Sequence, residues 1–471
     1  MTSVSMILSL AFALFSALAQ SAQTPAIAGR WEGAIDVAGA NLPFAVVFTP
    51  GATTLEAAID IQGAKGVPLR AVSLAGNRVH FELPAGPGVA TFDGVLEADA
   101  ISGTFEQGPA RGKFTLTRAG APKPPEPAGP PPPYRVEDVT FANGGVTLAG
   151  TLTIPQGRGP FPALIMVTGS GAQNRDEELF GFKVFATIAD HLTRRGIAVL
   201  RYDDRGVGGS SGNIAASTTA DFAGDALAGL TLLAARPEID KARLGVFGHS
   251  EGADVAAIAA SRSPQVAFIV MMAGVAISGE AVLAGQQADG IRALGGTAEQ
   301  LAIEQAAFRK VAAAVRSGAA PAELAAALRE QIGAQYDTLA PETRAALGDR
   351  GSFIEKTLPM GLAQLQSAWM RYFISFDPAP VLAAVRCPVL AIFGERDTQV
   401  PPATNRPALE AAFAKGGNSR VTVKVYPEAN HLFIAAKTGL PSEYASLPKT
   451  FVPGFLDDIS AWLLSVGGGR R

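Results

Sequence analysis

The sequence has one cysteine, little charge and no excess of positive residues. Because Cys387 is the single cysteine, no intramolecular disulfide can form, and core packing must stabilise the fold. Charged residues make up 17% of the 471 residues and the formal net charge is −3, so nucleic acid is not an expected partner. Hydrophobic residues make up 48%, which is typical of a globular protein, and the length suits two or three domains.

Long apolar runs are also scarce, and none reaches the length of a membrane-spanning helix. Residues 1–22 contain an apolar stretch from Met6 to Ala19 that ends in Ala17-Leu18-Ala19, the small-x-small pattern that signal peptidase cleaves. No Lys or Arg precedes this stretch, so a buried N-terminal helix is the alternative. We expect a signal peptide and a periplasmic or secreted protein.

Residues 27–118 consist of short alternating segments broken by glycine and proline, for example Phe44–Phe48 and Arg78–Leu83. A period of two with frequent turns predicts a small antiparallel β domain. Residues 119–134 are dense in proline, which supplies no backbone donor to a sheet. This segment is predicted to be a stiff linker.

Residues 135–471 show strands that alternate with helices, after an opening hairpin that turns at Asn143-Gly144-Gly145. This rhythm predicts an α/β domain with a mainly parallel sheet and helices on both faces. An Ala-rich helical insertion, residues 277–373, is expected to cap the carboxyl ends of the strands, although a structural appendage far from the site is the alternative. The predicted strands include Ala163–Thr168, Ile197–Tyr202, Arg243–Gly248, Val266–Met272, Val389–Phe393 and Val421–Tyr426, and the predicted helices include Phe180–Arg195, Thr219–Ala235 and Glu251–Ser261.

Two segments match the pattern GxSxG that surrounds many nucleophilic serines, one centred on Ser250 and one on Ser210. A nucleophile elbow needs a strand, a tight turn with small residues, and then a helix. Only Ser250 has this context, because the strand Leu244–Phe247 precedes it and Gly252 leaves room for the turn. Ser250 is therefore the predicted nucleophile.

A serine hydroxyl needs a neighbouring base, which is normally an imidazole. Of the four histidines, His80 lies in the β domain, His191 lies in a predicted helix, and His249 is held in the elbow beside the serine. Elimination leaves His431, on the loop after the last predicted strand.

A carboxylate must orient that imidazole and stabilise its cation. Asp397 follows the strand Val389–Phe393 and gives the chain order Ser, Asp, His. Glu395 and Asp377 are the alternatives.

The oxyanion hole needs backbone N–H donors, one of them from Glu251, directly after the nucleophile. The second is expected from the glycine-rich loop after Ala163–Thr168, either from Ser170 or from Gly171. Residues 174–177 extend this loop. They are expected either to line the acyl or leaving-group side of the substrate site or to be solvated. Residues 203–206 are expected to hold the turn after their strand by local hydrogen bonds, and no chemistry is assigned to them.

Five motifs together resemble the bacterial esterases of the α/β-hydrolase superfamily related to EstD, a group close to the serine aminopeptidases. The resemblance implies an α/β-hydrolase fold, a β domain before it, and a carboxylesterase for short acyl chains with Ser250, Asp397 and His431 as its catalytic triad. Many superfamily members have His-Gly where this chain has Thr168-Gly169, which leaves open the N–H that serves as second oxyanion donor. The motifs are GSGAQNRDE (169–177), YDDRGVGGSSG (202–212), GHSEG (248–252), GERDTQVPP (394–402) and NHLF (430–433).

The sequence thus predicts a serine hydrolase that cleaves a small-molecule ester through an acyl-enzyme, without a metal or an organic cofactor. A peptidase or aminopeptidase is the first alternative, because the same triad cleaves amides. The second is a non-catalytic binding module that uses the β domain as its docking surface. The sequence gives no indication of oligomeric state.

Overall fold

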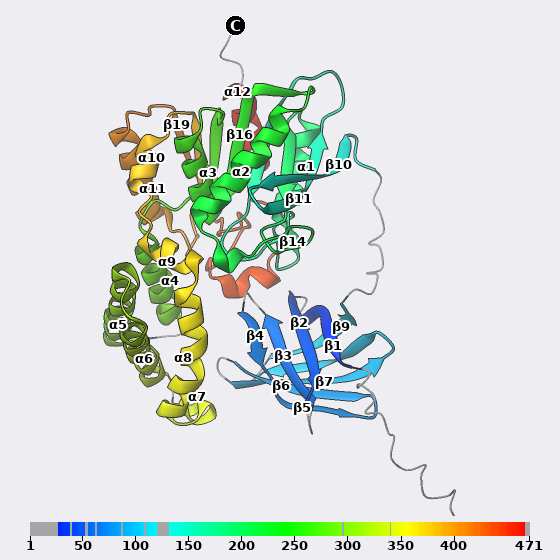
Figure 1. The fold of residues 1–471 in the computed structure, drawn as a ribbon, viewed down its shortest axis with the longest axis vertical. Helices are drawn as coiled ribbons and strands as arrows, with labels where there is room; N and C mark the ends of the chain where they lie inside the picture. The colour runs from blue at the N-terminus through cyan, green and yellow to red at the C-terminus, as the bar shows by residue number, and fades with distance from the viewer. Residues whose placement is uncertain are drawn as a thin grey trace, which may run out of the picture. The chain divides into compact units, whose positions relative to one another are not determined.

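The computed structural model describes residues 27–37, 40–51, 55–61, 64–85, 88–107, 110–119, 131–293, 296–339 and 341–466. The predicted signal peptide, residues 1–22, and most of the predicted proline-rich linker lie outside the described residues. The chain forms two compact units (Figure 1). The first is built on strands β1 to β9, and the second contains the elements from β10 to α12.

The first unit is a nine-stranded antiparallel sheet, which confirms the predicted small β domain as a fold. Its strand order is β4-β3-β2-β1-β9-β8-β7-β6-β5. The two ends of this order also meet, because the N–H of Leu69, just before β5, donates to the carbonyl of Ala57 in β3 at 2.9 Å. Because successive side chains alternate between the faces of a strand, the phenylalanines gather inside, where the rings of Phe81 and Phe92 stack 4.6 Å apart. The strands are β1 (Gly29–Val37), β2 (Ala40–Pro50), β3 (Leu55–Ile61), β4 (Ala64–Pro68), β5 (Arg70–Ala75), β6 (Arg78–Ala85), β7 (Gly88–Glu97), β8 (Ala100–Gln107) and β9 (Ala110–Arg118).

The second unit contains an eight-stranded sheet in the order β10-β11-β15-β12-β16-β17-β18-β19. The first two strands form the predicted hairpin, and β11 also runs antiparallel to β15. The other pairs, in the order β15-β12-β16-β17-β18-β19, are all parallel. This confirms the predicted mainly parallel sheet. The strands are β10 (Arg135–Asn143), β11 (Val146–Ile154), β12 (Phe161–Val167), β15 (Ala198–Tyr202), β16 (Ile239–His249), β17 (Phe268–Met272), β18 (Val389–Gly394) and β19 (Val421–Tyr426), and β13 (Glu178–Leu179) and β14 (Phe182–Lys183) form a separate small hairpin.

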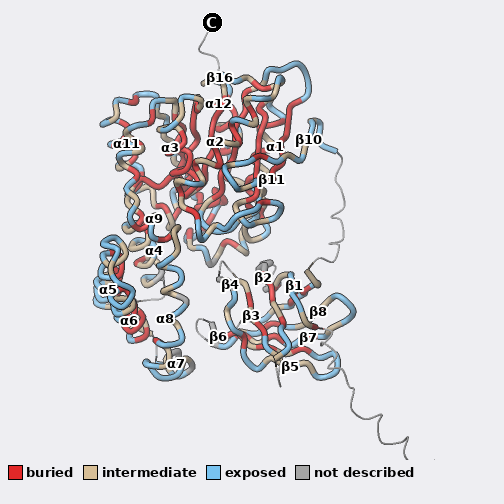
Figure 2. Tube along the Cα trace, in the orientation of Figure 1, coloured by how far each residue is buried: buried red, intermediate tan, exposed pale blue. Residues whose placement is uncertain are grey.

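Helices cover both faces of this sheet because its strands are apolar on both sides. Ile165 of β12 packs in the core under α2 and α3, while its neighbours Leu164 and Met166 pack in the opposite core, under α1 and α12. Figure 2 shows this sheet as the most continuously buried part of the unit. The helices are α1 (Val184–Arg194), α2 (Thr219–Ala234), α3 (Glu251–Arg262), α10 (Ala379–Ala384), α11 (Pro402–Lys415) and α12 (Phe455–Val466), with short 3₁₀ turns η1 (Ile214–Ala216) and η2 (Pro441–Ser446).

Between β17 and β18, six of the described helices precede α10 and cover most of the segment in which the sequence predicts an insertion. They have a core of their own, in which Val311, Leu328 and Ile354 are buried, and a second small cluster around Phe308 and Met370. This group of helices is called the cap. Its members are α4 (Gly279–Ala293), α5 (Ala298–Ser317), α6 (Pro321–Thr338), α7 (Pro341–Leu347), α8 (Arg350–Gln366) and α9 (Ala368–Ser375).

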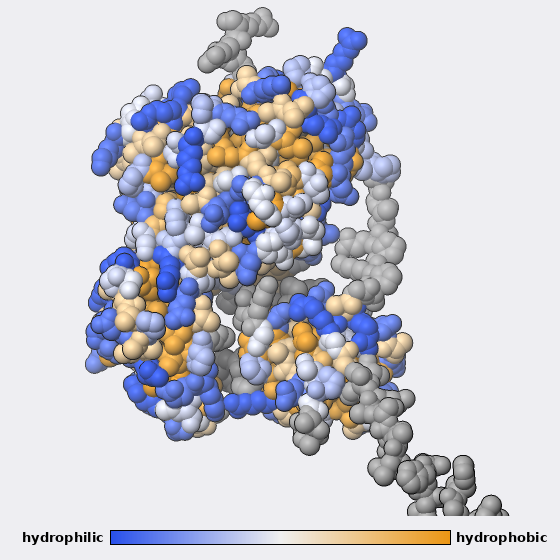
Figure 3. Space-filling view, in the orientation of Figure 1, coloured by the Kyte–Doolittle hydropathy of each residue, from blue (hydrophilic) through white to orange (hydrophobic). Residues whose placement is uncertain are grey.

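The surface drawn in Figure 3 mixes hydrophilic and hydrophobic residues on both units. Within the described ranges, no helix combines the length and the apolar character needed to cross a bilayer. The large apolar side chains that are exposed there are scattered along the chain: Val89, Val95, Val136, Ile303 and Leu464.

Candidate active site

Ser250 lies at a sharp turn between the end of β16 and the start of α3. Its backbone has φ +54° and ψ −120°, a conformation that a residue with a side chain rarely adopts. The turn is possible because its flanking glycines meet other backbone: a Cβ on Gly248 would lie 1.8 Å from the Gly252 carbonyl oxygen, and a Cβ on Gly252 would lie 2.2 Å from the Val167 carbonyl oxygen. This is the strand-turn-helix geometry of a nucleophile elbow.

Ser210, at the centre of the second GxSxG match, has a different setting. Its side chain is buried, its Oγ donates to the carbonyl of Asp203 at 2.7 Å, and the same oxygen accepts the N–H of Ala149 at 2.9 Å. Both bonds fix the loop after β15 onto β11, so this serine has a structural role.

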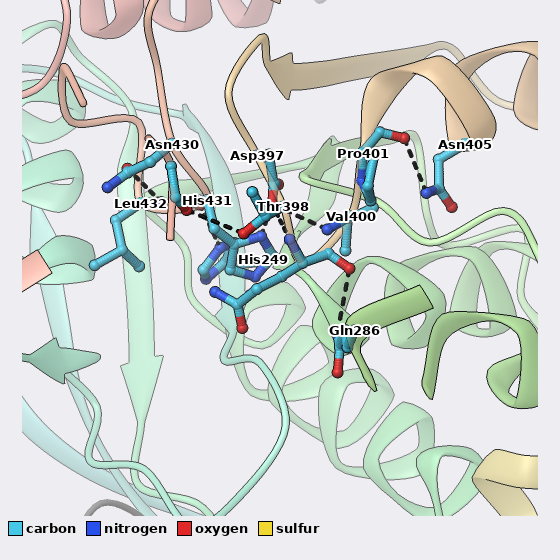
Figure 4. A network of polar contacts seen from close by, with 12 residues as sticks. His249, Gln286, Asp397, Thr398, Val400, Pro401, Asn405, Asn430, His431 and Leu432 are labelled. Carbon is cyan, nitrogen blue, oxygen red and sulfur yellow. Dashed lines mark hydrogen bonds and ion pairs between the residues drawn. The ribbon is translucent and has the colours of Figure 1, made fainter. Parts of the chain in front are cut away.

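His431 and Asp397 lie on the loops after β19 and β18, and the structure brings them together. Nδ1 of His431 is 2.7 Å from Oδ2 of Asp397, while Oδ1 of Asp397 accepts the N–H groups of Gln399 at 2.8 Å and Val400 at 2.9 Å (Figure 4). Burial alone would raise the pKa of Asp397, but His431 and these two backbone donors hold it below its ordinary value. The carboxylate is therefore kept ionised beside the imidazole.

The two alternative acids make other contacts. Glu395 accepts the backbone N–H of Glu428 at 2.9 Å, and Asp377 accepts the N–H of Ala379 at 3.0 Å. Each of these bonds closes a loop at the surface, and the carboxylate that contacts His431 is Asp397.

The loop that carries His431 is fixed by the residue before it. Asn430 is fully buried, and its Oδ1 accepts the N–H groups of Leu432 at 2.9 Å and Ile434 at 3.1 Å. This side-chain turn sets the direction in which His431 leaves the backbone.

Ser250 and His431 line one cavity of about 290 Å³, together with two of the three residues predicted for the oxyanion hole, Ser170 and Glu251. Gly171 is not among the lining residues. The backbone of this loop passes directly against the nucleophile, since a Cβ on Gly169 would lie 3.2 Å from the Ser250 Cβ.

Comparison with known proteins gives two family matches and one curated relative. The model of the serine aminopeptidase family S33 matches residues 182–324, and the model of the dienelactone hydrolase family matches residues 377–448. The esterase EstD of Thermotoga maritima is 28% identical over 339 residues, which cover 71% of this chain and 68% of EstD. The chain is a hydrolase with the α/β-hydrolase fold and is similar to EstD.

Solved structures with similarity to this hydrolase include an esterase of Pyrococcus furiosus, at 18% identity and a TM-score of 0.41, over 69% of this chain and 94% of that one. A proline iminopeptidase of Mycobacterium smegmatis has 20% identity and a TM-score of 0.39, over 70% of this chain and 98% of that one.

The side chain of Glu251 connects helix α2 to the cap, a contact that the sequence did not predict. It is almost fully buried, and Oε1 accepts the hydroxyl of Thr219 at 2.7 Å, while Nε1 of Trp369, on cap helix α9, donates to both carboxylate oxygens at 2.9 and 3.0 Å. Ser170 contributes a further side-chain hydrogen bond. Burial raises the pKa of Glu251 against the opposing effect of these donors. Glu251 therefore joins the cap to the glycine-rich loop after β12, residues 168–173, which is called the oxyanion loop after its predicted role.

Residues 203–206 hold their turn by local hydrogen bonds, as predicted, since Asp203 accepts the N–H of Gly209 at 3.1 Å and the carbonyl of Asp204 accepts the N–H of Val207 at 2.9 Å. Two of these residues also make longer-range contacts that the sequence did not predict. Asp204 accepts the hydroxyl of Thr168 at 2.8 Å and the N–H of Gln173 at 2.9 Å, and Asp203 accepts the N–H of Arg175 at 2.9 Å and its guanidinium at 2.7 Å. These acids therefore fix the oxyanion loop from the neighbouring strand. Burial raises the pKa of Asp204 to about 8.

The segment 174–177 contributes structural contacts, and its members are not among the residues that line the cavity. Asp176 pairs with Arg201, and Glu177 is fully buried against His249, so the alternative of a merely solvated segment does not hold for these two acids.

The cavity walls are mainly apolar, with a few amide and carboxylate groups. Both the cap and the sheet loops contribute. The apolar lining residues are Leu179, Phe180, Val275, Val282, Leu283, Trp369, Phe373, Val400, Leu432, Pro441 and Tyr444, and the polar ones besides those already named are Gln173, Gln286 and Gln399.

Proposed function

We propose that this hydrolase is a carboxylesterase that cleaves short-chain acyl esters with Ser250 as nucleophile, His431 as general base and Asp397 as the orienting acid. The observation that carries the proposal is the pairing of the His431 Nδ1 with a buried carboxylate, on an imidazole that opens onto the same cavity as Ser250. The similarity to a protein named as an esterase supports ester substrates. The mainly apolar cavity wall suits an acyl chain.

In the first half of the reaction, Ser250 Oγ attacks the ester carbonyl carbon while Nε2 of His431 takes its proton. The bond from Nδ1 to Asp397 keeps this second nitrogen unprotonated beforehand and stabilises the imidazolium afterwards. Negative charge then develops on the carbonyl oxygen, where the N–H groups of Glu251 and Ser170 donate. The alcohol leaves with the proton from His431.

In the second half, water gives a proton to His431 and attacks the acyl carbon. The bond from this carbon to Ser250 Oγ then breaks, His431 returns the proton to Oγ, and the acid is released. Ser170 lines the cavity and Gly171 does not, which favours the N–H of Ser170 as the second oxyanion donor.

The match to a serine aminopeptidase model favours a second candidate, cleavage of an aminoacyl amide at the same site. A panel of p-nitrophenyl esters from acetate to decanoate and of aminoacyl p-nitroanilides separates the two. We expect esters of short acids to give the highest kcat/KM, and Ser250→Ala to lower kcat by about 10⁴- to 10⁶-fold. Faster turnover of anilides would favour the aminopeptidase, and normal ester turnover by Ser250→Ala would overturn both.

We also propose export, on the basis of the apolar stretch in residues 1–22. Expression of the full chain with a C-terminal tag, followed by N-terminal sequencing of the periplasmic and medium fractions, tests it. A cleaved N-terminus close to Ala19 is expected, and an intact chain confined to the cytoplasm would contradict it.

A further inference from the structure

His249 is buried beside the nucleophile, and both of its ring nitrogens have partners. Nδ1 lies 2.8 Å from Oε1 of Glu177, and Nε2 lies 3.0 Å from the backbone carbonyl oxygen of His431. Figure 4 shows its ring directly beside that of His431, and the ring centroids are 4.7 Å apart. The histidine that elimination set aside thus contacts the loop of the proposed base.

The chemistry of these partners fixes the protons. A carbonyl oxygen only accepts, so Nε2 of His249 must carry a hydrogen. Oε1 of Glu177 lies within hydrogen-bond distance of both the N–H of Gly169 and Nδ1 of His249. An ionised Glu177 can accept from both groups, and it then places a hydrogen on Nδ1 as well. With both nitrogens protonated, His249 is an imidazolium.

The charged and titratable groups that face His249 agree with this assignment. Burial alone would lower the pKa of His249, but the charge and hydrogen bond of Glu177, the carbonyl of His431 and the charge of Asp397 together raise it. Glu177 has a backbone φ of +47°, unfavourable for a residue with a side chain, and its Oε2 has no hydrogen-bond partner within the described part of the chain. The polar contacts of this carboxylate are therefore directed to His249 and Gly169.

We propose that Glu177 and His249 form a buried ion pair that positions the catalytic base. The pair connects three segments. His249 belongs to the elbow, Glu177 accepts the N–H of Gly169 in the oxyanion loop, and His249 contacts the carbonyl of His431 in the loop after β19. Both are positioning residues, since they act through His431 and Gly169. This inference rests on the proposed function, because it takes His431 as the base.

The protonation state is tested directly by NMR of the full chain labelled with ¹⁵N at its histidine rings. The four histidines are assigned with the variants His80→Gln, His191→Gln and His249→Gln. We expect two protonated ring nitrogens on His249 at pH 7, and one unprotonated nitrogen after Glu177→Gln removes the negative charge. One unprotonated nitrogen on His249 in the unsubstituted protein at pH 7 would overturn the ion pair, whatever the enzyme's substrate.

The positioning role is tested by steady-state ester kinetics. His249→Leu removes the donor to the His431 carbonyl and should lower kcat by about 10- to 100-fold with a smaller change in KM, because the base is misplaced while the other residues that line the cavity stay the same. His249→Gln places an amide N–H near the former Nε2 and should recover part of that loss. His80→Gln is the matched control, since His80 also pairs with a carboxylate, Asp93, at 2.7 Å but lies in the first unit, and its kcat should be unchanged.

The outcomes separate this inference from the proposed function. If His249→Leu keeps full kcat, or if His249→Gln is no better than His249→Leu, the contact to His431 does not position the base. If ester turnover survives Ser250→Ala, the proposed function fails instead, while the NMR result still decides the ion pair.

Discussion

The indole N–H of Trp369 donates to both carboxylate oxygens of Glu251, at 2.9 and 3.0 Å, so the residue after Ser250 anchors a helix of the cap. Trp369 also stacks on Phe373, with ring centroids 5.3 Å apart, and both rings line the cavity. Trp369 therefore contributes both to the wall of the cavity and to the attachment of the cap.

Trp369→Phe should separate these two roles, because it keeps an aromatic ring and removes the N–H. Leaving the buried Glu251 with one donor fewer should lower the free energy of unfolding by about 1 to 3 kcal/mol. Urea denaturation measures it. Trp462→Phe is the matched control, because its N–H bonds Thr422 at an exposed site, 3.3 Å away, and its loss should be much smaller. Equal losses in the two variants would show that the bond to Glu251 carries no special weight.

Asp397→Asn should lower kcat by about 10³- to 10⁴-fold, because an amide no longer stabilises the His431 imidazolium or enforces its tautomer. Initial rates with a short p-nitrophenyl ester measure it. The alternative acids serve as controls, and Glu395→Gln and Asp377→Asn should retain their kcat. A large loss in Glu395→Gln with normal turnover in Asp397→Asn would reassign the acid.

Asp204 and Asp203 should affect stability with opposite dependence on pH. Burial raises the pKa of Asp204 to about 8 from 3.8, so between these values the folded protein holds a proton that the unfolded chain has lost, and stability falls as pH rises. Asp204→Asn removes this effect, and its stability relative to the unsubstituted protein should rise by about 1.4 kcal/mol or more between pH 5 and pH 9.

Asp203 gives the contrasting result. Burial opposes the shift, but the side-chain and backbone bonds of Arg175 lower the pKa of Asp203. Its contribution is present above the unfolded pKa and is lost as pH falls through the folded one. Asp203→Asn should therefore destabilise the protein at pH 7, and the difference should shrink below about pH 4. Urea denaturation across this pH range measures both variants, and parallel profiles would contradict the assignment.

Gly252→Ala should disrupt the elbow, because a Cβ there would lie 2.2 Å from the Val167 carbonyl oxygen. We expect a loss of at least about 2 kcal/mol in the free energy of unfolding, together with loss of ester turnover. Gly285→Ala, in cap helix α4, is the control, because its Cβ would meet nothing within 4 Å and the change should stabilise the helix by about 0.5 to 1 kcal/mol. A harmless Gly252→Ala would mean that the turn at Ser250 relaxes freely.

Local patterns predicted the parts of the fold that local forces determine. Helix α2 begins after Thr218, whose hydroxyl caps Asp221 while Asp221 caps Thr218 in return, and the hairpin turns at Gly144 with φ +56°. The predicted helix Phe180–Arg195 instead begins at Val184, because Gly181, with φ +75°, turns the chain into the small hairpin β13–β14. That turn depends on one glycine inside a pattern that otherwise continues the helix.

The chemistry of the residues and their order along the chain were enough to predict Ser250, Asp397 and His431 as site residues. They were not enough to predict the residues that hold this site in place. His249 meets Glu177 across 72 residues of sequence, and Trp369 meets Glu251 across 118. Such pairs depend on how the cap and loops pack over the sheet, and a single sequence carries no period or spacing that reveals them. The sequence offered a hint of such contacts only for Asp203 and Asp204, because two adjacent acids stand at the carboxyl end of a central strand.

The most direct test of the central claim is the site of covalent modification by a fluorophosphonate, read by peptide mass spectrometry. One adduct per chain, on the peptide that contains Ser250 and absent after Ser250→Ala, is the predicted result. An adduct on the peptide that contains Ser210, or full labelling of Ser250→Ala, would contradict the assignment of Ser250 as the nucleophile.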